Sequence, residues 1–185
     1  GALSLITDGD KEATDCSYVE LSPATQWVQI DLGKSLPLWA VVVWHDHRND
    51  PVVYYDVIIQ VSDDKDFIEN VRTIYNNDHD NSSGLGIGED WGYRETNEGL
   101  LAPAKGVKAR YVRLYSNGNT ANDDNRYTEV EVFAAPQGQP DQPQQQPQQP
   151  QKAPAAAAPA ATPKPPAAPR SEERRVGKEC SVTCR

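Results

Sequence analysis

Apolar residues recur at every second position through much of the first 135 residues, which is the periodicity of β-strands with one buried face. The alternation runs through residues 27–32, 55–61, 110–115 and 129–133. Residues 38–44 instead form an almost continuous apolar run, as expected of a strand covered on both faces. Turn-forming residues separate these runs, and no segment has the pattern of an amphipathic helix. Short strands without helices between them predict an all-β fold, a sandwich or jelly roll.

The composition changes abruptly near residue 135. Every Trp, Tyr and Phe lies between Tyr18 and Phe133, whereas 11 of the 15 Pro residues lie between Pro136 and Pro169. We therefore expect a folded domain over residues 1–135 and a disordered Pro/Gln/Ala-rich linker over residues 136–169. Residues 170–180 resemble the translation of a short-read sequencing adapter, so we expect residues 170–185 to be an artefactual tail. The folded part contains a single Cys, Cys16, and it cannot form an internal disulfide.

Charge is also unevenly distributed. Residues 1–135 carry 23 acidic and 11 basic side chains, whereas residues 136–185 carry 4 acidic and 7 basic ones. A domain without a clustered basic surface is a poor nucleic-acid binder, so we expect no nucleic-acid partner. No apolar run approaches the roughly 18 residues that a membrane helix needs, so we expect no membrane span. An acidic surface keeps a protein soluble and suits cations and neutral polar ligands. We expect the protein to be a monomer.

Five short segments follow one another in an order that is informative. They are LITDGD at 5–10, WVQIDLGK at 27–34, YYDVIIQVSDD at 54–64, ARYVRLY at 109–115 and TEVEVF at 128–133. Together they resemble the motifs of discoidin (coagulation factor 5/8 type C) domains, and among these they are similar to family 32 carbohydrate-binding modules. The resemblance implies a galactose-binding-domain-like jelly-roll β-sandwich that binds glycans without catalysis. It also implies a bacterial protein that is secreted or held at the cell surface.

The chain departs from the family pattern in three places. Discoidin domains have a further strand before the first motif, and there is no room for it here, so we expect the domain to be truncated at its N-terminus. The first residues, Gly1-Ala2-Leu3, show no signal-peptide pattern, so we expect the signal sequence to be absent from this fragment. The connection over residues 76–101 is longer than usual, so family ligand residues cannot be transferred to it. Ala134 stands where the closing motif has Gly.

The resemblance further implies a structural Ca²⁺ ion between the first and last motifs. Its ligands would be the carbonyls of Leu5, Asp10 and Thr128, the side chains of Asp8 and Glu129, and Thr14. These are the hard oxygen ligands that Ca²⁺ prefers. One extra residue before Thr14 also permits Ala13 to take that register. The alternative is an ordinary turn with solvated acids and an edge-strand Glu.

The long polar connection over residues 76–101 has two possible roles. Asp78, Asp80, Ser82 and Glu89 fall at EF-hand positions, but Ser83 replaces the required Gly and no helices flank the loop, which excludes an EF-hand. An irregular second cation site remains an alternative. Asn81 also begins a glycosylation sequon. Structureless loops of this length inside a compact domain are usually functional, which favours a ligand surface.

Sugar recognition needs an aromatic face and polar groups that hydrogen-bond hydroxyls. The loop after Trp44 and the long connection supply both kinds of residue. We expect the ligand, a glycan or polysaccharide, to contact His45, Arg48, Asn77, Trp91 and Tyr93. In the alternative interpretation Trp44 lies in the core, the histidines are ordinary loop residues and Trp91 packs the connection onto the sandwich.

Catalysis has little support in the residue pattern. No Ser/His/Asp or Cys/His set has a suitable context, and Gly84, Gly86 and Gly88 do not fit a dinucleotide-binding fingerprint. The three histidines are weak candidates for a transition-metal site. We therefore expect a non-catalytic carbohydrate-binding module of a secreted multidomain protein. The alternatives are an adhesion module for protein or lipid headgroups, and an accessory domain of a glycoside hydrolase or similar secreted hydrolase.

Overall fold

The computed structural model describes residues 2–12, 17–48 and 52–135. A short 3-10 helix, η1 (Leu3–Thr7), precedes six strands: β1 (Val19–Leu21), β2 (Gln26–His45), β3 (Ile58–Ser62), β4 (Arg72–Asn76), β5 (Leu100–Ser116) and β6 (Asn125–Ala134). The strands pair in the order β1-β6-β2-β5-β3-β4, and every pairing is antiparallel. The predicted all-β fold is confirmed. The expected linker at 136–169 and tail at 170–185 lie outside the described residues, as does Cys16.

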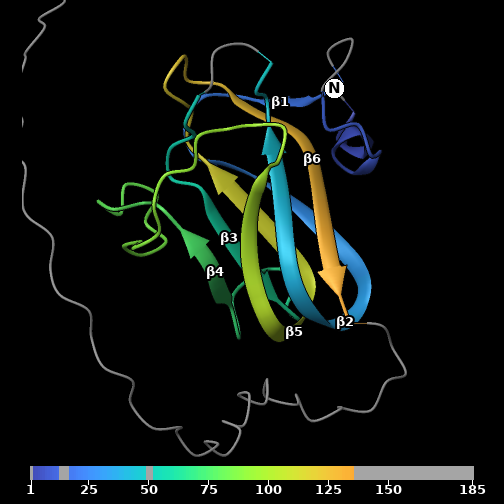
Figure 1. The fold of residues 1–185 in the computed structure, drawn as a ribbon. Coiled ribbons are helices and arrows are strands. Elements are labelled where there is room, and N and C mark those ends of the chain that lie inside the picture. Colours follow the sequence, from blue (N-terminus) through green and yellow to red (C-terminus); the bar gives the residue numbers. More distant parts are fainter. Residues whose placement is uncertain (1, 13–16, 49–51, 136–185) are drawn as a thin grey trace, which may run out of the picture. The chain divides into compact units, whose positions relative to one another are not determined.

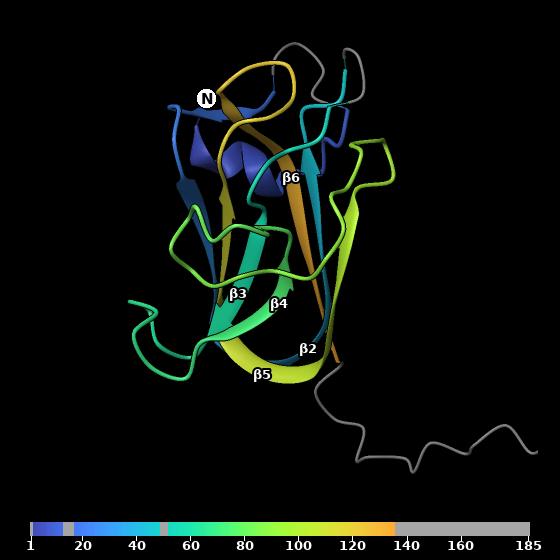
Figure 2. The same cartoon turned by 90° about the vertical axis from the view of Figure 1, so that its left-hand side faces the viewer.

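Two long strands give the sheet its two layers (Figures 1 and 2). The first half of β2, residues 26–31, pairs with residues 111–116 of β5, which in turn pair with β3. The second half of β2 pairs with residues 100–109 of β5 and with β6. A register shift separates the two halves of β2 between Asp31 and Leu36, where Gly33 adopts a φ of 76°. The bend lets one strand contribute to both layers of the sandwich.

The core lies between these layers and is made by the inward members of the alternating runs. Its residues include Val28, Leu38, Val41, Val43, Ile59, Val61, Ala102, Val112, Leu114 and Val130. No helix in the described part of the chain is long and apolar enough to cross a membrane.

The expectation that residues 38–44 are covered on both faces is right at one end of the run and wrong at the other. Trp44 is only 4% exposed, because Gly99 packs against its ring and the Lys11 ammonium lies 4.5 Å from the ring centroid. Trp39 is 52% exposed. The register of β2 shifts between Leu38 and Ala40 on both of its edges, which is a β-bulge that the residue pattern does not reveal.

Candidate functional site

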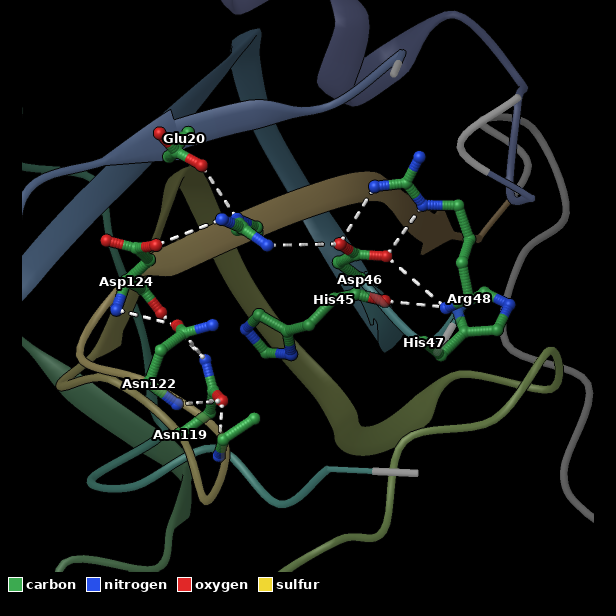
Figure 3. A network of polar contacts seen from close by, with 10 residues as sticks. Glu20, His45, Asp46, His47, Arg48, Asn119, Asn122 and Asp124 are labelled. Carbon is green, nitrogen blue, oxygen red and sulfur yellow. Dashed lines mark hydrogen bonds and ion pairs between the residues drawn. The ribbon is translucent and has the colours of Figure 1, made fainter. Parts of the chain in front are cut away.

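Loops gather at the end of the sandwich where β2 ends and β6 begins (Figure 3). They enclose a shallow hollow of about 50 Å³, lined by Asp46, Val52, Tyr54, Asn119, Ala121, Asn122 and Arg126. The antiparallel bridge between Tyr54 and Asn119 joins the loop after β2 to the loop before β6. The lining of the hollow includes both polar and apolar side chains. Its size suits a single hydroxyl or hydroxymethyl group and excludes a whole sugar ring.

A network of ion pairs forms one wall of the hollow (Figure 3). Arg126 contacts three carboxylates: Nε lies 2.7 Å from Glu20, Nη2 lies 2.9 Å from Asp124, and Nη1 lies 3.7 Å from Asp46. Arg48 donates to both oxygens of Asp46, from Nε at 2.9 Å and from Nη2 at 3.0 Å. The hydrogen bonds from Arg48 hold the pKa of Asp46 below its ordinary value, against the opposing effect of burial. The carboxylate therefore stays ionised and keeps a fixed orientation.

Tyr18 lies beside both arginines of this network. The guanidinium carbon of Arg48 is 4.8 Å from the ring centroid of Tyr18, and that of Arg126 is 5.5 Å away. Cation–π contacts of this kind restrain the arginine side chains. The donors at this end of the sandwich are thus held in place before any ligand arrives.

The loop before β6 forms the opposite wall and is organised by its own amides. Asn119 donates from Nδ2 to Asn122 Oδ1 at 3.0 Å and to the carbonyl of Asp124 at 2.9 Å. Its Oδ1 accepts from the backbone N–H groups of Ala121 and Asn122 at 2.9 and 3.1 Å. The loop therefore presents amide groups in a preformed arrangement, which reduces the entropy lost when a ligand binds.

His45, one of the predicted contacts, lies beneath the hollow and is fully buried. Its Nδ1 is 2.8 Å from Oε1 of Glu95, a residue of the long connection that the sequence analysis did not single out. The imidazole stacks on Tyr54 at a centroid distance of 4.2 Å and also contacts Tyr127 at 4.8 Å. His45 thus supports the tyrosine that lines the hollow, and its side chain is not open to solvent.

The other predicted contacts fall into two groups. Arg48 and Trp91 reach the surface, and the side chain of Trp91 is 88% exposed, so it does not pack the connection onto the sandwich. Asn77 accepts from the N–H of Val57 at 2.6 Å, which ties the connection to the sandwich. Tyr93 packs against the core and its hydroxyl hydrogen-bonds Thr96 at 2.8 Å. The exposed pair is available to a ligand, whereas Asn77 and Tyr93 hold the loop.

A group of three aspartates organises the same connection. Oxygens of Asp56, Asp78 and Asp80 all lie within 4.8 Å of one another. Asp78 is fully buried, and burial raises its pKa, but hydrogen bonds from Ser83 and Ser82 outweigh this effect and lower it overall. Asp56 accepts from Ser82 at 2.7 Å and from Asn117 at 2.8 Å. The alternative second cation site thus consists of three adjacent aspartates and does not include Glu89. Each of the three carboxylates already accepts hydrogen bonds from the protein.

Two of the residues expected to hold Ca²⁺, Asp8 and Glu129, lie close together where the turn after η1 meets β6. The N–H of Gly9 donates to Oε2 of Glu129 at 3.0 Å, which brings the turn containing Asp8 against β6. Burial is the main cause of a raised pKa at Glu129, and the negative charge of Asp8 adds to it. Thr128 Oγ1 is buried and has no hydrogen-bond partner within the described residues. A bound cation would offset the two neighbouring carboxylates, so Asp8 and Glu129 fit the ion; Thr14 lies outside the described residues.

Comparisons with known proteins establish the fold. No protein-family model matches the chain, and no curated protein matches it either. Among solved structures, it resembles a family 89 glycoside hydrolase from Clostridium perfringens solved with PUGNAc, with a TM-score of 0.54 and 23% identity. The match covers 75% of this chain and only 13% of the hydrolase.

Two isolated modules match over most of their own length. The CBM32 of AlyQ, solved with 4,5-unsaturated mannuronic acid, has a TM-score of 0.52 and 20% identity, and the match covers 71% of this chain and 85% of that one. A pectin-binding carbohydrate-binding module has a TM-score of 0.52 and 18% identity, with 72% and 81% covered. The chain therefore has the discoidin-like β-sandwich fold of these modules.

Proposed function

We propose that residues 1–135 are a non-catalytic carbohydrate-binding module of a secreted or cell-surface bacterial protein. The observation that carries the proposal is the preformed polar hollow at the loop end of a sandwich whose fold is that of carbohydrate-binding modules. The same fold occupies 13% of a glycoside hydrolase. This supports a role as an accessory domain that holds a hydrolase or similar secreted enzyme on its substrate.

The geometry accounts for weak, non-covalent sugar binding. The Asp46 carboxylate accepts from sugar hydroxyls, Arg48 donates to them, and the amides of Asn119 and Asn122 do both. The exposed ring of Trp91 covers an apolar sugar face. Because the hollow holds about 50 Å³, most of the sugar stays in solvent and the affinity of one site is low. Tethering to a larger protein would raise the effective affinity.

A binding assay with neutral sugars tests this proposal. Galactose, N-acetylgalactosamine and neutral galactan are titrated into the whole chain by isothermal calorimetry, after a glycan array has ranked them. Trp91→Ala and Arg48→Met should each lower affinity at least tenfold, whereas Ile87→Ala, an equally exposed change in the same connection, should leave it unchanged. Trp91→Ala and Ile87→Ala should unfold within about 0.5 kcal/mol of wild type, because both side chains lie at the surface. Arg48→Met should cost more, about 1–3 kcal/mol, because it removes the bidentate partner of the buried Asp46 carboxylate. Absence of binding to every glycan on the array would refute the proposal.

We further propose that a Ca²⁺ ion stabilises the module at the turn between η1 and β6. Asp8 and Glu129 would hold it through their carboxylates, and Leu5, Asp10 and Thr128 through their carbonyls. The ion would supply positive charge that joins the N-terminal turn to the last strand. Support comes from the Gly9–Glu129 hydrogen bond, which holds the Asp8 turn against β6, and from the raised pKa of Glu129, caused mainly by burial.

Thermal unfolding with and without the ion tests this second proposal. A ligand that binds only the folded state raises the melting temperature as its concentration rises. Millimolar Ca²⁺ should therefore raise the melting temperature above its value in chelator, and Asp8→Ala should remove the difference. Identical melting curves in the two conditions would contradict the site.

A further inference from the structure

The outer surface of one layer carries an apolar patch that the loop-end site does not use. We define the outer sheet face as Trp39, Ala40, Leu101, Pro103, Lys105 and Phe133. Strand register places Ala40 between Pro103 of β5 and Phe133 of β6, and places Val42 opposite Leu101. Figure 1 shows the three strands side by side at the front of the domain. Residues from distant parts of the chain thus form one flat, three-stranded surface.

The aromatic and aliphatic side chains of this face are open to solvent. Trp39 is 52% exposed, Leu101 58% and Phe133 49%. The bulge in β2 places both Trp39 and Ala40 between the inward residues Leu38 and Val41. Exposed apolar groups that cluster on one face, unlike those scattered singly, mark an interaction surface.

The charge of the outer sheet face is opposite to that of the domain as a whole. Residues 32–45, 99–118 and 132–135 contain no Asp or Glu, although acids outnumber bases by 23 to 11 in residues 1–135. The same segments contain Lys34, Lys105 and Lys108. One acid, Glu131 of β6, lies opposite Val42 in the same row as Leu101, and Lys11 pairs with it at 2.7 Å. With Glu131 paired to Lys11, an exposed aromatic surface beside Lys105 and Lys108 is complementary to an anionic partner.

Lys105 is held in a costly backbone conformation at the edge of this face. It lies in the register gap of β5 opposite Trp39, between the pairs Ala40–Pro103 and Leu38–Val107. Its φ is 53°, in the left-handed region that Asn and Gly adopt more easily than Lys. The side chain is exposed. The ammonium group of Lys105 is therefore presented to solvent at the edge of the outer sheet face, where a ligand can reach it.

We propose that the outer sheet face is a second glycan-binding surface, selective for anionic polysaccharides built from uronic acids. Sugar rings stack on Trp39 and Phe133, and ring carboxylates receive charge-assisted hydrogen bonds from Lys105 and Lys108. A flat sheet face suits an extended polymer, whereas the small hollow at the loop end suits one projecting group. The inference rests on the proposed function in that both sites bind carbohydrate, but it concerns different residues.

The net charge of the domain does not prevent such binding. At physiological ionic strength the Debye length is about 8 Å, so exposed charges farther away than that are largely screened. The Asp56, Asp78 and Asp80 group belongs to loops after β4 and before β3, not to the three strands of the outer sheet face. Local lysines therefore dominate the potential that a uronate chain meets on this surface.

Affinity electrophoresis of the whole chain in gels containing polygalacturonate tests the proposal. Fully methyl-esterified pectin is the matched ligand, because it keeps the backbone and loses the charge. Lys105→Asn removes the ammonium group while retaining a residue that tolerates a positive φ, and Trp39→Thr removes the ring while retaining strand propensity. Lys65→Asn is the matched charge control, since Lys65 is exposed in the loop after β3. Trp91→Ala is the control for the loop-end site.

We expect polygalacturonate to retard the wild-type chain, with an affinity that falls as salt is raised. Lys105→Asn and Trp39→Thr should each weaken retardation at least tenfold without lowering the melting temperature, and Lys65→Asn and Trp91→Ala should have no effect. Retardation that survives both face variants, or that Trp91→Ala abolishes, would overturn the second surface while leaving the loop-end function intact. No retardation by polygalacturonate would also overturn it. Sedimentation is also compared for the wild type and Trp39→Thr. If the wild type is a dimer and Trp39→Thr is a monomer, a second copy of the chain covers the outer sheet face, and the proposal is overturned.

Discussion

Truncation of His45 should destabilise the domain far more than loss of a surface ligand contact would. The His45 side chain is fully buried, stacks on Tyr54, contacts Tyr127, and hydrogen-bonds Glu95, which is itself 2% exposed. Removing one partner of a buried hydrogen-bonded pair leaves the other group unsatisfied, which costs about 1–3 kcal/mol. Loss of the imidazole also leaves a cavity beneath Tyr54. Because the cavity and the unsatisfied Glu95 both count against the variant, we expect His45→Ala to lower the free energy of unfolding by about 3–5 kcal/mol.

Urea unfolding followed by tryptophan fluorescence measures this loss, and the midpoint should fall while the m-value stays constant. Glu95→Ala should cost a similar amount, since it breaks the same pair. The double variant His45→Leu/Glu95→Leu should recover much of the loss, because it removes both buried polar groups. A cost below about 1 kcal/mol for His45→Ala, the range of an average substitution, would refute the reasoning and return His45 to the ligand surface.

Four other outcomes follow from the structure. Because the pKa of Glu129 is raised in the folded state, chiefly by burial, the ion-free domain should lose stability as pH rises above the unfolded value of 4.5; Glu129→Gln should flatten this pH dependence of urea unfolding. Asp78→Ala removes the acceptor for Ser82 and Ser83 and should cost about 1–3 kcal/mol, with faster amide exchange confined to residues 78–88 if the loop opens locally. Gly99→Ala would place a Cβ 2.5 Å from the Trp44 ring at a φ of +75°, so its melting temperature should drop sharply, and an unchanged value would contradict this packing. A chain ending at Ala135 should keep the melting transition of the full chain, and a large shift would show that residues 136–185 support the fold.

The alternation of apolar residues along the sequence was enough to predict much of the fold. Alternation at residues 27–32 and 110–115 identified segments that lie in β2 and β5, because the period of two depends only on strand geometry and one buried face. The five motifs also predicted the discoidin-like sandwich that the structural comparisons establish. The approach of the Asp8 turn to Glu129 was implied by the resemblance to discoidin domains and not by the residue pattern itself.

Which side chains pair with one another, and which are exposed to solvent, depended on tertiary contacts that no local sequence pattern encodes. Glu95 lies 50 positions from His45, so nothing near either residue indicates that they form a buried pair. The importance of Arg126 could not be predicted from the sequence, because it depends on ion pairs with Glu20, Asp46 and Asp124. These three acids come together only when β1, β2 and β6 are assembled. Residue type and spacing determine which face of a strand is apolar. Whether a given side chain then contacts core, loop or solvent is decided by strand register and by the bulge that turns Trp39 outward.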